Sequence, residues 1–149
     1  IFLPEGKRFG VVGRRVARMA VPLEPLDPAV ALFLEERHLA TLTLVRPDGT
    51  PHVTPVGFSY DAEARVARVI TWAGSRKYAL TSAGTGVPAA LAQVDGGRWL
   101  TLEGTAVATT EPERVAAAVA SYAERYRQPG ERDDRVAIEV SVSRILGRA

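Results

Sequence analysis

The chain has 149 residues, of which 46% are hydrophobic, and its formal net charge is +2. This length and composition are typical of one globular domain with a core of its own. The charge is too small to indicate a nucleic-acid-binding protein, and no apolar run in the sequence is long enough for a membrane span. Without cysteine and with only two histidines, neither a disulfide framework nor a cysteine- or histidine-rich metal site is expected.

The first 18 residues differ in composition from the rest of the chain. They carry five of the 19 basic residues and one of the 17 acidic residues, and the single methionine, Met19, follows them. We expect residues 1–20 to be a disordered lead-in, with a natural start at Met19, to a domain over residues 21–149. A basic arm for nucleic acid and a targeting segment are the alternatives, although a secretory signal would need a central apolar stretch.

Helix signals occur at three places. Asp27 followed by Pro28 is typical of an N-cap and first helical position, and predicts a helix that ends near residue 38. Ser75 can cap a short helix that runs to about residue 82. Thr110-Glu111-Pro112-Glu113 is typical of a capping box and predicts a longer helix.

Alternating apolar residues between Gly, Pro and Asp turns predict the strands, over residues 39–45, 51–60, 65–71, 87–94, 98–108 and about 136–143. In the last strand Val136, Ile138, Val140 and Val142 are expected to face inward, and the residues between them outward. Short antiparallel strands of this number predict a mainly β fold, a small barrel with flanking helices.

The segment Thr71-Trp72-Ala73-Gly74-Ser75-Arg76-Lys77 joins the third strand to the short helix. Its two cations would lie at the positive end of a helix, where cations are slightly unfavourable unless an anion binds. A hydroxyl, free N–H groups and two cations suit a phosphate. A solvated basic turn is the alternative.

No nucleophile elbow, Walker A loop, His-Glu-x-x-His motif or Rossmann glycine pattern occurs in the sequence. His52 is either a surface residue or a ligand contact, and Trp99 either packs in the core or stacks on a flat ligand. Because no acid, base or nucleophile is evident, the chemistry is expected to come from a bound cofactor.

Residues 39–104, which end in Arg98-Trp99-Leu100-Thr101-Leu102-Glu103-Gly104, resemble the pyridoxamine 5′-phosphate oxidase-like split β-barrel superfamily. Ser75-Arg76-Lys77 is similar to the phosphate-binding turn of that family, and the resemblance extends over residues 26–147. It implies a split β-barrel of about six antiparallel strands and a homodimer with the cofactor at the subunit interface. FMN-binding members carry Arg and Lys where this chain has Thr54 and Ser59. The strand from His52 to Phe58 is similar instead to the deazaflavin (coenzyme F420) branch.

The resemblance implies three groups of cofactor-binding residues and neither a catalytic side chain nor a metal. The second strand would lie along the deazaflavin through its backbone, the turn would hold the phosphate, and the third group would reach in from the partner subunit. In that order the residues are His52, Val53, Thr54, Pro55, Val56, Gly57; Thr71, Gly74, Ser75, Arg76, Lys77; and Gly97, Arg98, Trp99.

The implied activity is that of an F420-dependent oxidoreductase that transfers a hydride from the reduced deazaflavin to a conjugated substrate. Reduction of biliverdin to bilirubin is the leading case, and its propionates would make Arg98 and Arg135 substrate contacts. An FMN-dependent oxidoreductase and a non-catalytic F420 carrier are the alternatives. We expect a cytoplasmic protein that acts on a small molecule, with neither nucleic acid nor membrane as a partner.

Overall fold

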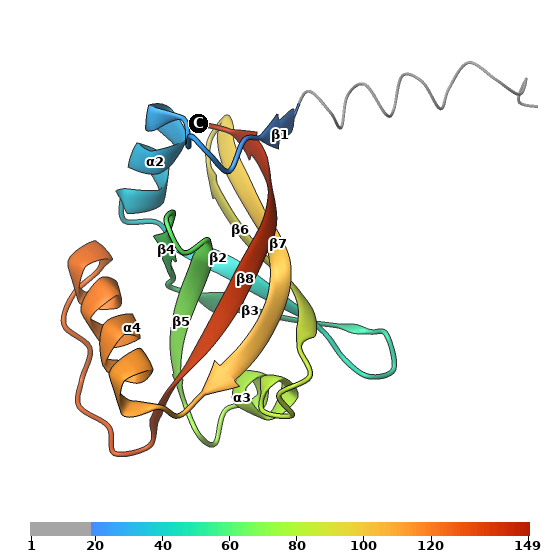
Figure 1. Cartoon of the computed structure of the whole chain (residues 1–149), viewed down its shortest axis with the longest axis vertical. Helices are drawn as coiled ribbons and strands as arrows, with labels where there is room; N and C mark the ends of the chain where they lie inside the picture. The colour runs from blue at the N-terminus through green and yellow to red at the C-terminus, as the bar shows by residue number, and fades with distance from the viewer. Residues whose placement is uncertain (1–18) are drawn as a thin grey trace, which may run out of the picture.

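The computed structural model describes residues 19–149, in which an antiparallel sheet of eight strands is flanked by three helices (Figure 1). The strands are β1 (Ala20–Val21), β2 (Ala40–Val45), β3 (Pro51–Val56), β4 (Ser59–Asp61), β5 (Val66–Trp72), β6 (Val87–Asp95), β7 (Arg98–Thr109) and β8 (Arg135–Arg148). The helices are α2 (Pro28–Glu35), α3 (Arg76–Thr81) and α4 (Pro112–Arg125). Of the expected lead-in over residues 1–20, all but Met19 and Ala20 lies outside the described residues.

The strand order is β3-β2-β6-β7-β8-β5-β4, and β1 pairs with β8 beside this path. β3 and β4 form the two ends of the sheet and do not pair with each other, so the curved sheet is a split barrel. The expected mainly β, antiparallel fold with flanking helices is confirmed. β8 lies between β7 and β5 and joins the two parts of the sheet.

The strand count exceeds the expected six because one predicted strand is divided and β1 was not predicted. The strand expected over residues 51–60 is interrupted at Gly57 and Phe58, between β3 and β4. There the backbone N–H of Phe58 donates to the hydroxyl of Tyr126 (3.1 Å), and the Phe58 carbonyl accepts from Arg125 (2.7 Å). The backbone at this break therefore bonds to side chains from the end of α4 instead of to a neighbouring strand.

Two of the three predicted helix starts are confirmed. The Asp27 carboxylate caps α2 by accepting from the N–H of Ala29 (2.8 Å), and Ser75 caps α3. The capping box at Thr110 is wrong, because Glu111 is the N-cap of α4 and makes no side-chain cap hydrogen bond. Since β7 runs on to Thr109, it is the Thr109 hydroxyl that accepts from the N–H of Glu111 (3.2 Å).

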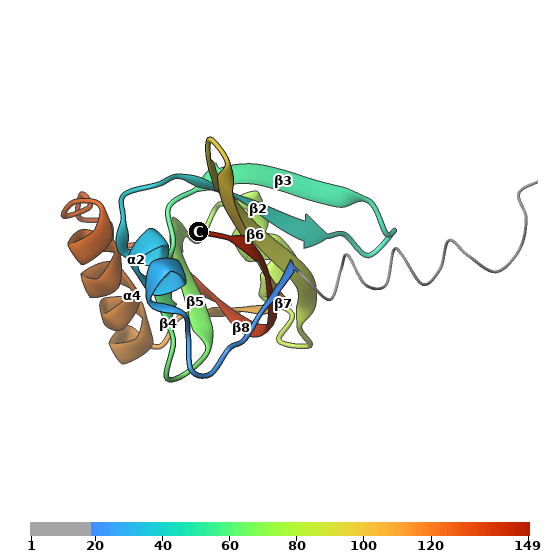
Figure 2. The ribbon, with the colours of Figure 1, turned by 90° about the horizontal axis from the view of Figure 1, so that it is seen from above.

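The core fills the inside of the curved sheet. Val136, Ile138, Val140 and Val142 of β8 are buried there as predicted. Ala137 was expected to face outward, yet it is fully buried, because α4 packs over β5 and β8. α2 and α4 lie on the same side of the molecule, next to β4 (Figures 1 and 2). Within residues 19–149, no helix combines the length and apolar character that a membrane crossing requires.

Candidate functional site

The turn between β5 and α3 is fixed by two buried hydroxyls. The hydroxyl of Ser75 accepts hydrogen bonds from the N–H of Tyr78 (3.2 Å) and from the hydroxyl of Thr71 (2.9 Å). Both side chains are almost completely buried. The expected role of Ser75 as a helix cap is therefore confirmed, and its contacts hold the turn that presents Arg76 and Lys77.

The ammonium group of Lys77 lies above an exposed tryptophan. Its Nζ atom is 5.5 Å from the centre of the Trp72 ring, and the guanidinium of Arg132 is 5.3 Å from the same ring. Arg132 also pairs with Asp134 (2.9 Å), whereas Lys77 has no ion pair among the described residues. Partial burial lowers the pKa of Lys77. An anion bound next to Lys77 would supply the missing counter-charge.

Lys77 lines an open pocket of about 330 Å³. It lies where the ends of β3 and β5 meet α3 and the loop between α4 and β8. Lys77, Arg127 and Arg135 contribute cations to its wall, and Trp72 and Tyr122 contribute aromatic rings. Among residues 19–149, no carboxylate lines it. Such a pocket suits a ligand that combines a flat ring with an anionic group.

β3 turns alternate side chains toward the inside of the split barrel. His52 and Thr54 lie opposite Leu44 and Leu42 of β2, whose side chains are fully buried. Residues directly opposite each other in an antiparallel pair project to the same face of the sheet. His52 and Thr54 therefore face inward, and the residues between and beside them, such as Val53, project outward.

Two polar atoms on this inner face are shielded from solvent and have no hydrogen-bond partner within the described chain, Nδ1 of His52 and Oγ1 of Thr54. Such atoms are uncommon, since each costs about 1–3 kcal/mol. Burial lowers the pKa of His52, and the nearby charges of Arg46, Lys77 and Arg76 lower it further. The strand thus places a hydroxyl and an imidazole of lowered pKa near three cations, which fits a cofactor that carries a phosphate.

Ser59 and Gly57, beyond β3, have different surroundings, and only Gly57 lines the pocket beside Lys77. Ser59 lies on β4, beyond the break, and is buried at a hollow between α2 and α4 rather than at the pocket beside Lys77. A Cβ atom on Gly57 would come within 2.8 Å of the Tyr122 ring. Glycine at this position therefore lets the end of β3 approach α4.

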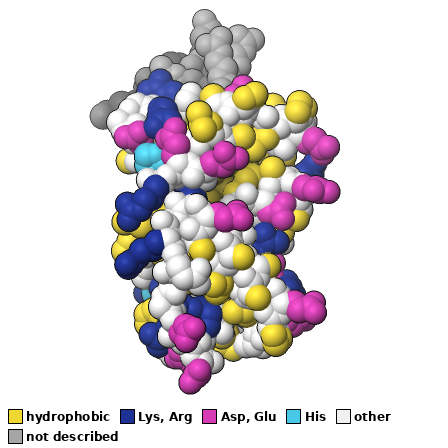
Figure 3. Space-filling model, turned by 90° about the vertical axis from the view of Figure 1, so that its left-hand side faces the viewer, with side chains coloured by type: hydrophobic (Ala, Val, Ile, Leu, Met, Phe, Trp, Pro, Cys, Tyr) yellow, Lys and Arg dark blue, Asp and Glu magenta, His cyan; other side chains and the backbone are white. Residues whose placement is uncertain are grey.

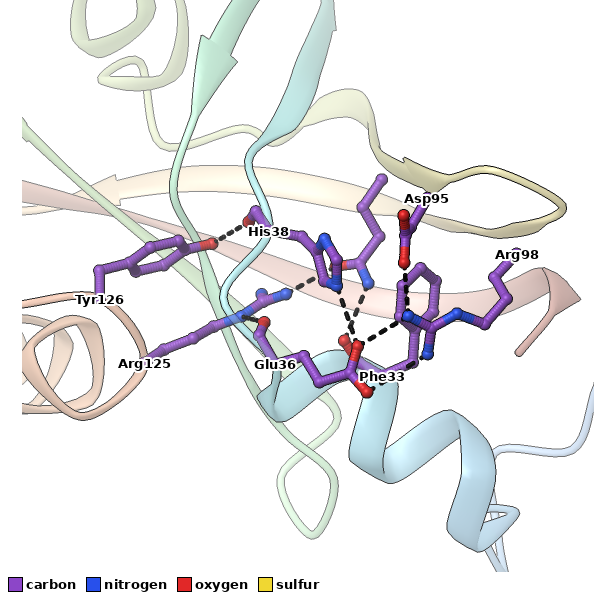
Figure 4. Close-up of polar contacts among 8 residues, drawn as sticks. Phe33, Glu36, His38, Asp95, Arg98, Arg125 and Tyr126 are labelled. Carbon is purple, nitrogen blue, oxygen red and sulfur yellow. Dashed lines mark hydrogen bonds and ion pairs between the residues drawn. The ribbon is translucent and has the colours of Figure 1, made fainter.

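The third expected group lies at the hairpin between β6 and β7 and is not in the pocket of Lys77. Arg98 pairs with Glu36 (2.9 Å) and Asp95 (2.6 Å), and its guanidinium lies 4.4 Å from the centre of the Phe33 ring (Figure 4). The side-chain hydrogen bond of Glu36 with Arg98 lowers the pKa of Glu36 most, and its hydrogen bond with His38 lowers it further, to about 2. Arg98 is therefore held by two carboxylates and an aromatic ring of its own chain.

Glu36, His38 and Asp95 bring possible metal-ligand atoms within 4.8 Å of one another, but the guanidinium of Arg98 bonds to both carboxylates. A cation therefore already bridges them. Gly97, next to Arg98, accepts a hydrogen bond at its carbonyl from Arg148 (2.7 Å).

Trp99 and Pro55 line a shallow hollow on the outward side of the sheet. We call the outward side of β2, β3, β6 and the first part of β7 the outer face; it comprises Leu39, Thr41, Thr43, Val45, Pro51, Val53, Pro55, Pro88, Ala90, Ala92, Val94, Trp99, Thr101 and Glu103. Glu103 is its single charged residue and pairs with Arg144 (2.6 Å). By contrast, the side of α2 and α4 carries many side chains of both charges (Figure 3). An exposed apolar sheet face of this kind is typical of a protein–protein interface.

The structure thus brings the end of β3, Thr71, Lys77 and Arg135 together around one pocket. The other expected residues of the first two groups do not line it, namely His52, Val53, Thr54, Gly74, Ser75 and Arg76. Arg127 and Tyr122 also line it, and sequence analysis gave neither a role. The available signal was the set of arginines around the Pro-Gly loop, Arg127, Arg132 and Arg135, which the sequence alone could not place against β3.

A second buried cluster connects the elements around the break between β3 and β4. Arg125 donates to the carbonyls of Glu36 (2.9 Å) and Phe58 (2.7 Å) and to the side chain of Gln93 (2.7 Å). The hydroxyl of Tyr126 donates to the carbonyl of His38 (2.6 Å; Figure 4). This cluster ties α4 to α2, β4 and β6, and it is structural.

Comparison with known proteins agrees with the geometry. The sequence profile of the family described as pyridoxamine 5′-phosphate oxidase matches residues 26–149. The chain is 50% identical over 123 residues to a protein of Mycobacterium tuberculosis (strain CDC 1551 / Oshkosh) named F420H(2)-dependent biliverdin reductase, which covers 83% of this chain and 88% of that protein.

Two solved structures have related folds. A conserved hypothetical protein from Mycobacterium tuberculosis is 25% identical, with a TM-score of 0.65 and coverage of 83% of this chain and 84% of that one. A protein named F420 reductase is 26% identical, with a TM-score of 0.61 and coverage of 80% and 96%. With a profile match over nearly all of the described residues, a relative of 50% identity and the split barrel itself, the chain belongs to the pyridoxamine 5′-phosphate oxidase family.

Proposed function

We propose that this protein is an F420-dependent oxidoreductase that reduces a small conjugated substrate, with biliverdin as the leading candidate. The observation that carries the proposal is the pocket beside Lys77, to which the described residues contribute three cations and no carboxylate. It occurs in a chain that is 50% identical to a protein named F420H(2)-dependent biliverdin reductase. A structural relative named F420 reductase supports the same cofactor.

The residues of the turn and of β3 would hold the cofactor. Lys77 and Arg76 provide charge for the phosphate, and the wall formed by Trp72 and Tyr122 suits a planar ring. Reduced F420, when bound, supplies a hydride. The chain's own residues would orient the ring, neutralise the phosphate and keep water from the reacting face.

Arg135 and Arg127 are the substrate contacts that we favour for a ligand with carboxylates. Both line the pocket beside Lys77, and neither forms an ion pair among the described residues. Arg98 would first have to give up Glu36 and Asp95 before it could bind a propionate. Of the two substrate contacts expected from the sequence, Arg98 and Arg135, we therefore favour Arg135. We add Arg127 as a second contact.

We also propose that the protein is a homodimer that pairs through the outer face. Leu39, Val53 and Val94 on this face are 66%, 54% and 70% exposed, and covering them with a second copy would remove apolar area from water. Trp99 lies on the same face as Pro55 of β3. Pairing through this face would bring the hairpin of Gly97, Arg98 and Trp99 toward the cofactor of the other copy.

FMN is the alternative cofactor. FMN-binding members of the family carry two further cations, at positions where this chain has Thr54 and the buried Ser59. Two charge-assisted contacts to the phosphate would be missing, which favours F420.

The test is a fluorescence titration of the purified protein with F420 and with FMN, followed by mixing with reduced F420 and biliverdin. We expect tighter binding of F420, and loss of biliverdin absorbance as oxidised F420 appears. Tighter binding of FMN would overturn the cofactor assignment. Turnover of quinones or enones but not of biliverdin would overturn only the substrate. Tight F420 binding without turnover of any acceptor would indicate a carrier.

A further inference from the structure

The inner face of β3 carries polar groups that the fold itself does not use. Nδ1 of His52 and Oγ1 of Thr54 are two residues apart on the same face, both shielded from solvent and both without a partner among the described residues. A folded chain rarely leaves two neighbouring buried polar atoms unpaired unless something else binds them. Backbone contacts from β3 to a cofactor would leave both of these atoms unpaired.

The charged groups that act on His52 are cationic and come from two elements. Arg46 lies in the turn after β2, where its guanidinium donates to the carbonyl of Pro51 (2.6 Å), and Arg76 and Lys77 belong to α3. Asp48 in the same turn is held by the hydroxyl and the N–H of Thr50 (2.6 and 2.9 Å). These cations favour the neutral form of the imidazole and lower its pKa.

A bound anion reverses this balance. It offsets the charges of Arg46, Arg76 and Lys77 and gives the imidazole an acceptor for a hydrogen bond. Both changes favour the protonated ring. The Thr54 hydroxyl can donate to the same anion, since it is two residues along the same face of the strand.

We infer that the side chains of His52 and Thr54 contact an anionic group of the bound cofactor directly, and that a ring nitrogen of His52 takes up one proton from solvent as that group binds. The inference rests on the proposed function and adds two residue roles and a proton to it. Binding then strengthens as the pH falls, between the lowered pKa of His52 in the free protein and its higher pKa in the complex.

The experiment measures protons taken up when oxidised F420 binds, by isothermal titration calorimetry at about pH 6 in buffers of different ionisation enthalpy. The protein has two histidines, so H52Q is compared with the matched control H38Q, whose native ring contacts Glu36 (3.0 Å) outside the pocket. Any titration of F420 itself is common to all variants and cancels. We expect the wild type and H38Q to take up as much as one proton more than H52Q.

Three results discriminate the possibilities. Equal proton uptake by the wild type and H52Q, with F420 bound by both, would overturn the inference and leave the proposed function intact. No binding of F420 to the wild type would overturn the function and the inference together. If H52Q does not fold, the single histidine of H38Q reports instead, because its NMR pKa should rise when F420 is added; an unchanged or lower pKa would overturn the inference.

Thr54 is tested by T54V, which removes the hydroxyl and keeps the shape of the side chain. We expect F420 affinity to fall about threefold to tenfold, whereas T110V, at an exposed position that does not line the pocket beside Lys77, should bind as the wild type does. Equal affinities of T54V and the wild type would remove Thr54 from the contact.

Discussion

The hydroxyl of Thr71 at the end of β5 donates a 2.9 Å hydrogen bond to the hydroxyl of Ser75, and both side chains are buried. T71V removes this bond with little change in shape and leaves part of the bonding capacity of Ser75 unused. We expect the free energy of unfolding to fall by about 1 kcal/mol in urea denaturation. T110V should change it by less than about 0.5 kcal/mol, because Thr110 is exposed and does not cap α4. Equal losses would contradict the cap assignments.

Replacement of Lys77 should weaken cofactor binding without unfolding the protein. Lys77 is a cation of the pocket without a counter-charge in the described chain, so K77A loses a charge-assisted contact worth about 1.5–3 kcal/mol. The dissociation constant for F420 should rise about tenfold to a hundredfold in a fluorescence titration. R114A, which removes one positive charge of α4 outside the pocket, where Arg114 pairs with Glu111 and Glu139, is the matched control and should bind normally. Wild-type affinity of K77A would argue against this pocket as the phosphate site.

Arg125 should be among the most sensitive positions for stability. Its guanidinium donates to Glu36, Phe58 and Gln93 from a site that is 8% exposed. R125M leaves three buried acceptors without their donor, and should lower the free energy of unfolding by roughly 2–4 kcal/mol. R144M removes an exposed arginine that pairs with Glu103, and should cost less than about 1 kcal/mol. Chemical denaturation of both variants checks the difference, and similar losses would contradict it.

Glu36 should make stability depend on pH in the acid range. Its hydrogen bonds with Arg98 and His38 lower its pKa from an ordinary 4.5 to about 2. Because the folded-state pKa is the lower one, the stabilisation is complete above pH 4.5 and is lost as the pH falls toward 2. E36Q lacks this group, so its unfolding free energy should decline less steeply than that of the wild type over the same range. Parallel pH profiles would show that the ion pair contributes nothing to stability.

A charge on the outer face should separate the proposed dimer. Val53 is 54% exposed on this face, and Leu32 is 57% exposed on α2, on another side of the molecule. V53D would bury a carboxylate without a partner in the interface, whereas L32D would leave it in water. Analytical ultracentrifugation should give the dimer mass for the wild type and for L32D and a monomer for V53D. A V53D protein that remains a dimer would exclude the outer face.

Local patterns in the sequence were sufficient for much of the fold. The alternation of Val136, Ile138, Val140 and Val142 depends on residues two apart, and the caps at Asp27 and Ser75 on contacts within three residues. The false capping box at Thr110 shows the limit of such reasoning, because the length of β7 decides which residue begins α4. That length is set by pairing with β8, more than twenty residues further along the chain.

The candidate site was harder to predict from the sequence, because much of it depends on long-range packing. The break at Gly57 and Phe58 requires the hydroxyl of Tyr126, and the ion pair of Arg98 with Glu36 joins residues 62 positions apart. Arg127 reaches the pocket because α4 crosses the sheet and the following loop returns beside β5. No periodicity in the sequence encodes such a contact, whereas the turn at Ser75 could be identified because its parts are adjacent.

The position of β8 has a consequence for how the protein folds during its synthesis on the ribosome. β2, β3, β6 and β7 form one part of the sheet and β4 and β5 the other, and β8, which joins them, is the last of the eight described strands in the chain. A nascent chain that lacks β8 holds two partial sheets with open edges and an uncovered core, a state prone to aggregation. The two parts of the sheet can join only after β8 has left the exit tunnel, so a chain that stops before β8 cannot complete the fold.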